Sequence, residues 1–122
     1  MNDLKQRTKN FALRVIKLVE SLPKTRTSDV LGKQLIRSGT SVGANFRAAC
    51  RGRSPAEFQA KMGIVEEEAD ECCYWIELLT ESNQIKSSRT VELLKEAGEI
   101  TAIAVASIKT SRQHSRSKTR KP

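Results

Sequence analysis

Few side chains in this sequence have the types and spacing that catalysis requires. The single histidine, His114, lies in a basic C-terminal segment, so the rest of the chain has no imidazole for a Ser–His or Cys–His nucleophile pair. The cysteines are odd in number, and Cys72 and Cys73 are adjacent. Adjacent residues point about 100° apart on a helix, so these two thiols cannot chelate one ion. We therefore predict that the chain is not an enzyme and has no cofactor.

A run of carboxylates is the remaining candidate for catalytic or metal chemistry. Its members are Glu66, Glu67, Glu68, Asp70 and Glu71. Such closely spaced residues surround a helix, so most of them must face water or basic partners and cannot converge on one divalent ion. A metal-dependent enzyme built on this run is a minor alternative. A phosphate-binding loop is excluded, because Gly39 and Gly43 are not followed by Lys-Ser/Thr at the required spacing.

Basic side chains point to a different kind of function, the binding of a polyanion. The net charge of +8 is divided into +9 for residues 1–53, −7 for residues 54–108 and +6 for residues 109–122. Arginine and lysine contact phosphates well. The candidates for nucleic-acid binding are Lys33, Arg37, Arg47, Arg51 and Arg53 in the first block, and Lys109, Arg112, Arg116, Lys118, Arg120 and Lys121 in the last. Two other interpretations stay open: the first block pairs with the acidic block, and the last block only keeps the chain soluble.

The pattern of apolar residues predicts the elements that position these groups. Apolar residues recur every three or four positions in four segments, which is typical of amphipathic helices. The first helix is expected over about residues 3–21 and ends before Pro23. The third begins at Ser54-Pro55 with a capping box completed by Glu57, and ends at Ser82-Asn83. The fourth begins after Ser88. Its apolar face is built on Leu94, Ala97, Thr101, Ala104 and Ile108, with Leu93, Ile100 and Ile103 beside it, and fades near Lys109.

The second helix differs from the other three in having two adjacent turns that each contain a glycine, Gly39 and Gly43. It begins near residues 27–29, which are good N-cap residues. Gly39 and Gly43 each lower helix stability by about 1 kcal/mol relative to alanine. A loop at this point is one alternative. A continuous helix with a close helix–helix approach is the prediction, because the apolar pattern resumes in register at Val42 and Phe46.

Four helices joined by short connections predict an all-α, antiparallel up-down-up-down four-helix bundle over residues 1–108. Residues 109–122 contain only one kind of charge and no large apolar residue, so they are expected to form a disordered basic tail. No apolar run reaches the ~18 residues of a membrane span, and the N-terminus is polar. The expected location is therefore the cytoplasm.

A stretch of the second and third helices resembles a known family. The run from Gln34 to Arg47 and the later segments Glu67–Glu71 and Tyr74-Trp75 are similar to the 23S ribosomal RNA intervening-sequence proteins. The resemblance implies a homopentamer of four-helix bundles with no enzymatic activity. It also implies nucleic acid or a reverse transcriptase as partner, as in the related accessory subunits of diversity-generating retroelements. One departure is Ala48, where the family usually has Glu.

Several residues are candidates for structural or interface roles. Ser38, Ser41 and Asn45 recur at about one-turn spacing on the second helix, and we expect them to form a hydrogen-bonded layer within the bundle or at a subunit contact. Trp75 and Leu78 widen the apolar face of the third helix. That face either makes this helix the most buried one or forms a subunit interface. A protein-interaction scaffold is accordingly the alternative to RNA binding.

Overall fold

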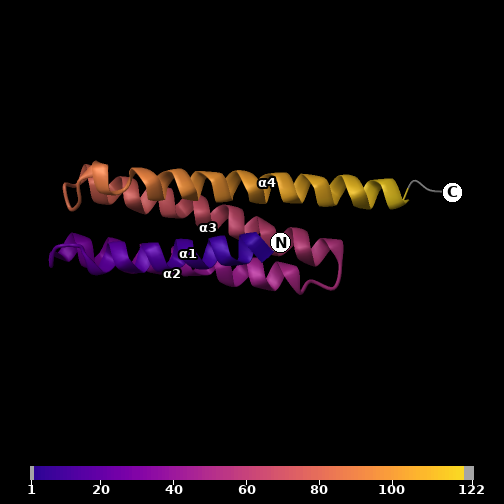
Figure 1. Cartoon of the computed structure of the whole chain (residues 1–122), viewed down its shortest axis with the longest axis horizontal. Coiled ribbons are helices and arrows are strands. Elements are labelled where there is room, and N and C mark those ends of the chain that lie inside the picture. The colour runs from indigo at the N-terminus through magenta and orange to yellow at the C-terminus, as the bar shows by residue number, and fades with distance from the viewer. Residues whose placement is uncertain (1, 120–122) are drawn as a thin grey trace.

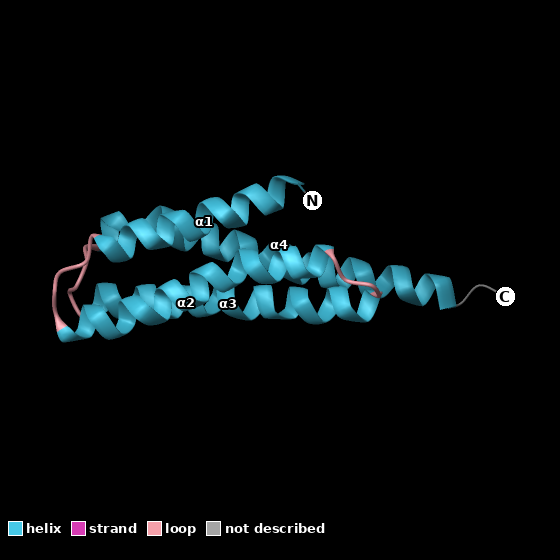
Figure 2. Ribbon diagram, turned by 90° about the horizontal axis from the view of Figure 1, so that it is seen from below, coloured by secondary structure: helices cyan, strands magenta, loops and turns pink. Residues whose placement is uncertain are grey.

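The computed structural model describes residues 2–119, which form four α-helices and one short 3-10 turn. The helices are α1 (Asn2–Glu20), α2 (Arg26–Cys50), α3 (Pro55–Glu81) and α4 (Val91–Thr119), and the turn η1 spans Ser87–Arg89. The α1–α2 and α3–α4 connections lie at one end of the bundle, and the α2–α3 connection lies at the other (Figure 1, Figure 2). The prediction of an all-α, antiparallel four-helix bundle is confirmed.

Hydrogen bonds at the helix starts explain where α2 and α3 begin. The Thr25 hydroxyl accepts a hydrogen bond from the backbone N–H of Ser28 at 3.0 Å, and α2 starts at Arg26. The Ser54 hydroxyl accepts from the N–H of Glu57 at 3.1 Å, and the Glu57 carboxylate accepts from the N–H of Arg53 at 2.6 Å. These bonds satisfy N–H groups that have no partner inside the helix. The predicted start of α3 is confirmed.

A left-handed residue ends α3. Asn83 has φ 63°, the conformation that asparagine tolerates better than other residues with a side chain. The N–H groups of Gln84 and Asn83 donate to the carbonyls of Leu79 and Thr80, which is the Schellman arrangement. The Gln84 side chain then accepts hydrogen bonds from the hydroxyls of Thr25 and Ser28. The α3–α4 connection is thereby joined to the start of α2.

The core follows the predicted faces closely in α1, α2 and α3. Phe11, Val15, Leu35 and Val42 are fully buried. On α3 the buried residues are Met62, Val65, Ala69, Cys72, Ile76 and Leu79. On α4 the predicted face residues Ala97, Ala104 and Ile108 are buried. Leu93 and Ile100 are buried there, whereas Leu94 and Thr101 are half-buried.

The second helix is continuous through its glycines, as predicted, and the glycines allow α1 to pack closely on α2. A Cβ atom at Gly39 would lie 2.8 Å from Cγ1 of Val15, closer than carbon atoms can approach. A Cβ at Gly43 would lie 3.3 Å from Oγ1 of Thr8. The loop alternative is wrong, because residues 26–50 form one helix.

The fourth helix is longer than predicted. Its buried face ends at Ile108, but α4 continues to Thr119, so residues 109–119 are helical and the expectation of disorder does not hold for them. Lysine, arginine and glutamine are good helix formers, and extending a packed helix needs no new nucleus. The side chain of Gln59 on α3 also donates to Ser111 at 3.0 Å. Arg120 and Lys121 lie outside the described residues, as does the side chain of Lys118.

Candidate nucleic-acid interface

The topology brings basic side chains from three distant parts of the sequence to one end of the bundle. The start of α1, the α2–α3 connection and the end of α4 all lie there (Figure 1). We call this surface the basic end. Its exposed cations include Lys5, Lys9, Arg47, Arg51, Arg53, Lys109, Arg112 and Arg116.

The arginines at the α2–α3 connection are exposed and lack carboxylate partners. Arg51 caps α2: its backbone N–H donates to the carbonyl of Ala48, and the N–H of Gly52 donates to the carbonyl of Ala49. The side chains of Arg47, Arg51 and Arg53 form no ion pair with any of residues 2–119. Pairing with the acidic helix therefore does not neutralise this part of the first basic block.

Arg37 behaves differently from these arginines. Its guanidinium binds the carboxylates of Glu68, at 3.0 Å, and Glu71 on α3. Glu71 also accepts a hydrogen bond from the indole N–H of Trp75 at 3.1 Å. Among the predicted phosphate contacts of the first basic block that the structure describes, Arg37 is therefore the one that pairs with the acidic helix. Its ion pairs join α2 to α3.

Lys33 lies away from the basic end. It is near the start of α2, towards the opposite end of the bundle, and forms an exposed ion pair with Asp29 at 3.4 Å. Such pairs contribute little to stability. The structure therefore does not bring Lys33 or Arg37 together with the other predicted phosphate contacts.

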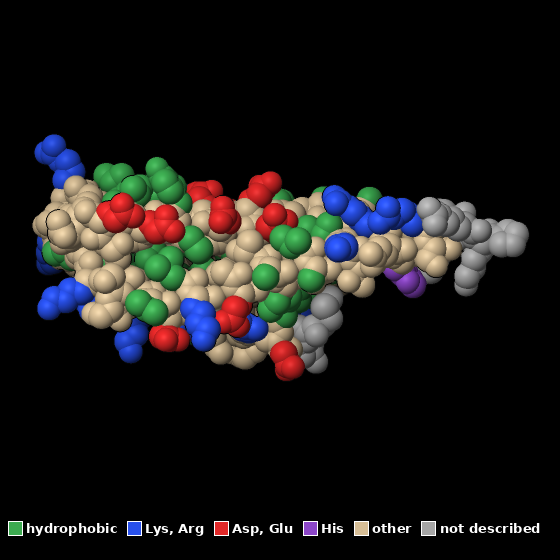
Figure 3. All heavy atoms as spheres, turned by 90° about the horizontal axis from the view of Figure 1, so that it is seen from above, with side chains coloured by type: hydrophobic (Ala, Val, Ile, Leu, Met, Phe, Trp, Pro, Cys, Tyr) green, Lys and Arg blue, Asp and Glu red, His purple; other side chains and the backbone are tan. Residues whose placement is uncertain are grey.

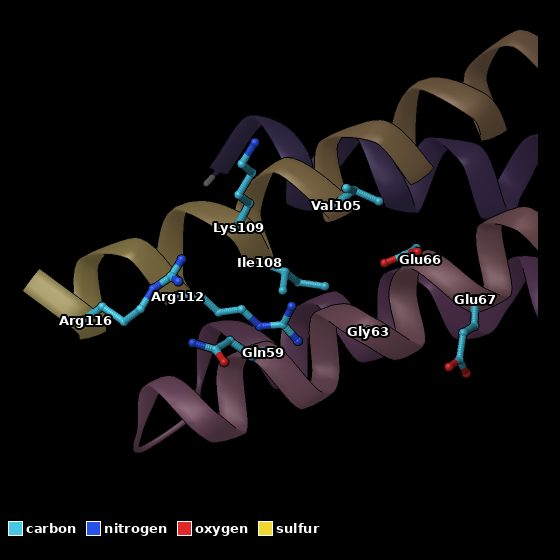
Figure 4. A pocket seen from close by; sticks show the side chains of 9 residues that line it. All are labelled: Gln59, Gly63, Glu66, Glu67, Val105, Ile108, Lys109, Arg112 and Arg116. Carbon is cyan, nitrogen blue, oxygen red and sulfur yellow. The ribbon is translucent and has the colours of Figure 1, made fainter.

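The end of α4 forms one wall of a groove of about 460 Å³, whose other wall is α3. Lys109, Arg112 and Arg116 line the α4 side (Figure 4). The Arg112 side chain reaches across towards Gln59 and Gly63 on α3 (Figure 4). On the face shown in Figure 3, Asp and Glu side chains lie along the middle of the bundle, and Lys and Arg side chains gather towards the end of α4. Lys and Arg side chains also lie at the opposite end in this view, so the acidic middle is flanked by basic side chains at both ends (Figure 3).

The candidate structural residues lie at the α2–α3 contact or make local bonds. Ser38 is buried within the bundle, where its hydroxyl donates to the carbonyl of Gln34 and accepts from the Cys72 thiol at 3.3 Å. The Asn45 amide donates to the carbonyl of Ser41 at 2.9 Å, a bond within one turn of α2. Trp75 and Leu78 are half-buried. Ser38 alone of these residues makes the expected cross-helix hydrogen bond.

The thiols and carboxylates of the described residues form no cluster that could hold a metal ion. No three His, Cys, Asp or Glu side chains among residues 2–119 gather where a metal ion could be held. Burial raises the pKa of the Cys72 thiol to about 12, so this group is protonated and unreactive near neutral pH. No helix of residues 2–119 is long and apolar enough to cross a membrane.

Comparison with known proteins places the chain in a family. Residues 2–106 match the model of the 23S rRNA-intervening sequence proteins. The chain belongs to this family. Among solved structures, it is similar to a Bacteroides thetaiotaomicron protein of unknown function from the S23 ribosomal protein family, with 35% identity and a TM-score of 0.82. The similarity covers 88% of this chain and 96% of the Bacteroides protein. A search of curated proteins gave no match.

Two basic residues at this end of the intervening-sequence bundle were not predicted as site residues. Lys5 and Lys9 lie on α1 beside Arg47 of α2, and all three line one groove. Their four-residue spacing puts the two lysines on one helix face, which the sequence alone can show. Arg47 lies beside these lysines because of the antiparallel register of α1 and α2, which periodicity alone does not predict.

Proposed function

We propose that this protein is a non-enzymatic, oligomeric bundle that binds RNA through its basic end. One observation supports this most strongly: cations from three elements gather at one end, and seven of the eight form no ion pair with residues 2–119. Unpaired, exposed cations favour a polyanion, because each phosphate contact releases condensed counterions. The family is named for 23S ribosomal RNA genes, and its description includes no enzymatic activity.

Helical geometry at the end of α4 suits an extended backbone better than a small ligand. Lys109, Arg112 and Arg116 recur at one-turn spacing on a helix that continues beyond the other three (Figure 1). One helical turn rises about 5.4 Å, close to the spacing of successive phosphates in a nucleic-acid strand. A helical arm holds these cations in a row, which a disordered tail would not do. RNA contacts are therefore assigned to this row and to the α2–α3 connection.

Self-association would multiply these contacts. The resemblance implies five subunits, and the exposed apolar side chains of Leu13, Val30, Tyr74, Val91 and Val105 are available for subunit contacts. Each additional basic end would bind at high effective concentration once the first is bound. The mass of the purified protein by light scattering tests this part of the proposal. A monomer at micromolar concentration would contradict it.

The experiment for RNA binding is a salt series with a labelled RNA hairpin. The full chain is compared with the variant Arg51→Gln/Arg53→Gln/Arg112→Gln, whose substitutions lie at the basic end. The matched control is Lys24→Gln/Arg26→Gln/Lys86→Gln, which removes three exposed charges near the opposite end. We expect tight binding at low salt and a slope of log affinity against log salt that falls by about 2 to 3 in the first variant only. Equal losses in both variants would show that only net charge matters.

A protein partner is the second candidate. The outer face of α3 carries Asp70, Glu77 and Glu81 around Tyr74, whose side chain is 54% exposed. An exposed aromatic ring among carboxylates is suited to a basic protein surface, such as that of a polymerase or reverse transcriptase. Two results together would favour this candidate. The wild type would not bind RNA at low salt, and it would capture such an enzyme in a salt-sensitive way that Tyr74→Ala does not.

A further inference from the structure

A second groove at the basic end lies between α1 and α2. It has a volume of about 240 Å³ and contains basic and small residues but no carboxylate. Lys5 and Lys9 contribute from α1, and Arg47 contributes from α2. A groove lined by three cations and no acid is suited to an anion.

The floor of this groove is built from small residues. Gly43 lies against Thr8, and Ala44 lies beside it. Because Gly43 has no side chain, the two helix backbones approach closely at this point. The close approach brings the cations of both helices to the rim of one shallow groove, where a tetrahedral anion can reach them.

The cations of this groove are not neutralised by the protein. Lys5, Lys9 and Arg47 form no ion pair with any of residues 2–119. Arg7, on another face of α1, is by contrast held at 2.7 Å by both Glu96 and Glu99 of α4. The sequence has no acidic residue between Asp29 and Glu57, so the second half of α2 offers no carboxylate.

We propose that this groove binds one backbone phosphate of RNA, with Lys5, Lys9 and Arg47 as its ligands. The inference rests on the proposed function and adds a defined contact to it. Three donors from two helices surround one phosphate, which fixes the position of the strand on the bundle and carries no base specificity. The groove faces the same end as the α2–α3 connection, so one strand can contact both.

The test measures RNA binding by the full chain across a salt series. The variant Lys5→Gln/Lys9→Gln/Arg47→Gln removes the ligands, and Lys24→Gln/Arg26→Gln/Lys86→Gln is the charge-matched control. We expect the groove variant to lose about ten-fold in affinity and to lower the salt slope by about 1, the value for one phosphate contact. Ala44→Glu, which adds a negative charge in the exposed groove, should also weaken binding, whereas its uncharged partner Ala44→Gln should bind like the wild type.

The possible outcomes separate the two proposals. If the wild type binds RNA and the groove variant behaves like the charge-matched control, the groove proposal is wrong and the proposed function stands. If the wild type does not bind RNA at low salt, both are wrong. Inorganic phosphate at constant ionic strength is the second probe. Phosphate could change the NMR shifts of the amides of residues 5–9 and 43–47 while the groove variants leave RNA affinity unchanged. That result would identify a site for free anions and overturn the proposal.

Discussion

Gly39 is the residue at which α2 has least room for a side chain. A Cβ there would lie within 3 Å of both Cγ atoms of Val15, which is itself fully buried. The substitution Gly39→Ala should lower the free energy of unfolding by about 1–3 kcal/mol, because overpacking outweighs the gain in helix propensity. Urea unfolding measures this. The matched control is Gly98→Ala, where a Cβ meets no atom within 4 Å and stability should rise by up to about 1 kcal/mol. Equal effects of the two substitutions would contradict the close α1–α2 contact.

The buried Cys72 thiol makes stability depend on pH in alkaline solution. Its pKa is raised by burial from 9.0 to about 12, so above pH 9 the unfolded chain loses this proton and the folded chain retains it. The contribution of Cys72 to stability is therefore complete below pH 9 and decreases as pH rises towards 12. Between pH 7 and pH 10 the wild type should lose about 1 kcal/mol more than Cys72→Ala. Urea unfolding of both proteins in reducing buffer measures this difference, and parallel losses would contradict it.

Sequence alone predicts much at the residue scale, but not which charges are neutralised. The burial of Cys72 and Ser38 follows from their places on the apolar faces. The different environments of Arg37 and Arg47 do not follow from the sequence. Both arginines lie on α2, and the sequence does not show which residues of α3 face each of them. Arg37 pairs with Glu68 and Glu71 across the α2–α3 contact, whereas Arg47 forms no ion pair with any of residues 2–119.

At the scale of elements, one arginine joins the first and last helices. Arg7 of α1 donates to the Glu96 carboxylate at 2.7 Å through two nitrogens and also binds Glu99. The interface between α1 and α4 is smaller than the interfaces α1–α2, α2–α3 and α3–α4. Arg7→Gln should lower stability by about 1 kcal/mol, since Arg7 is partly exposed. Hydrogen exchange of the α1 amides should accelerate, while Lys17→Gln should change little. Unchanged exchange in Arg7→Gln would show that apolar packing alone holds α1.

The same contact predicts an acid dependence. The hydrogen bond from Arg7 holds the pKa of Glu96 below its ordinary value of 4.5. The stabilisation from this carboxylate is therefore complete above about pH 4.5 and decreases as pH falls through the lowered pKa. Glu96→Gln should lose less stability than the wild type between pH 5 and pH 3. An equal loss in thermal unfolding experiments would place the acid sensitivity elsewhere.

Element boundaries were predictable where local chemistry sets them and not where packing does. The capping residues of α3 fixed its start, and Asn83 fixed its end. The end of α4 was placed too early, because an apolar face shows where burial stops and not where a helix stops. No glycine or proline lies between Ile108 and Thr119, so nothing in that segment breaks the helix.

At the scale of the whole molecule, basic segments that are far apart in the sequence come together at one end of the bundle. Antiparallel topology places the start of the first block, its end and the last block at one end, while the acidic block occupies α3 and most of α4. The sequence shows the blocks and predicts the four helices. The α1–α2 groove depends on the helix register and on Gly43, so it emerges only in three dimensions.

The central claim, that the basic end is the RNA-binding surface, is tested most directly by photocrosslinking. The wild-type chain is irradiated with RNA hairpins containing 4-thiouridine, and crosslinked peptides are identified by mass spectrometry. We predict crosslinks within residues 5–9, 47–53 and 109–116. Crosslinks confined to residues 24–33 and 86–95, near the opposite end, would contradict the claim.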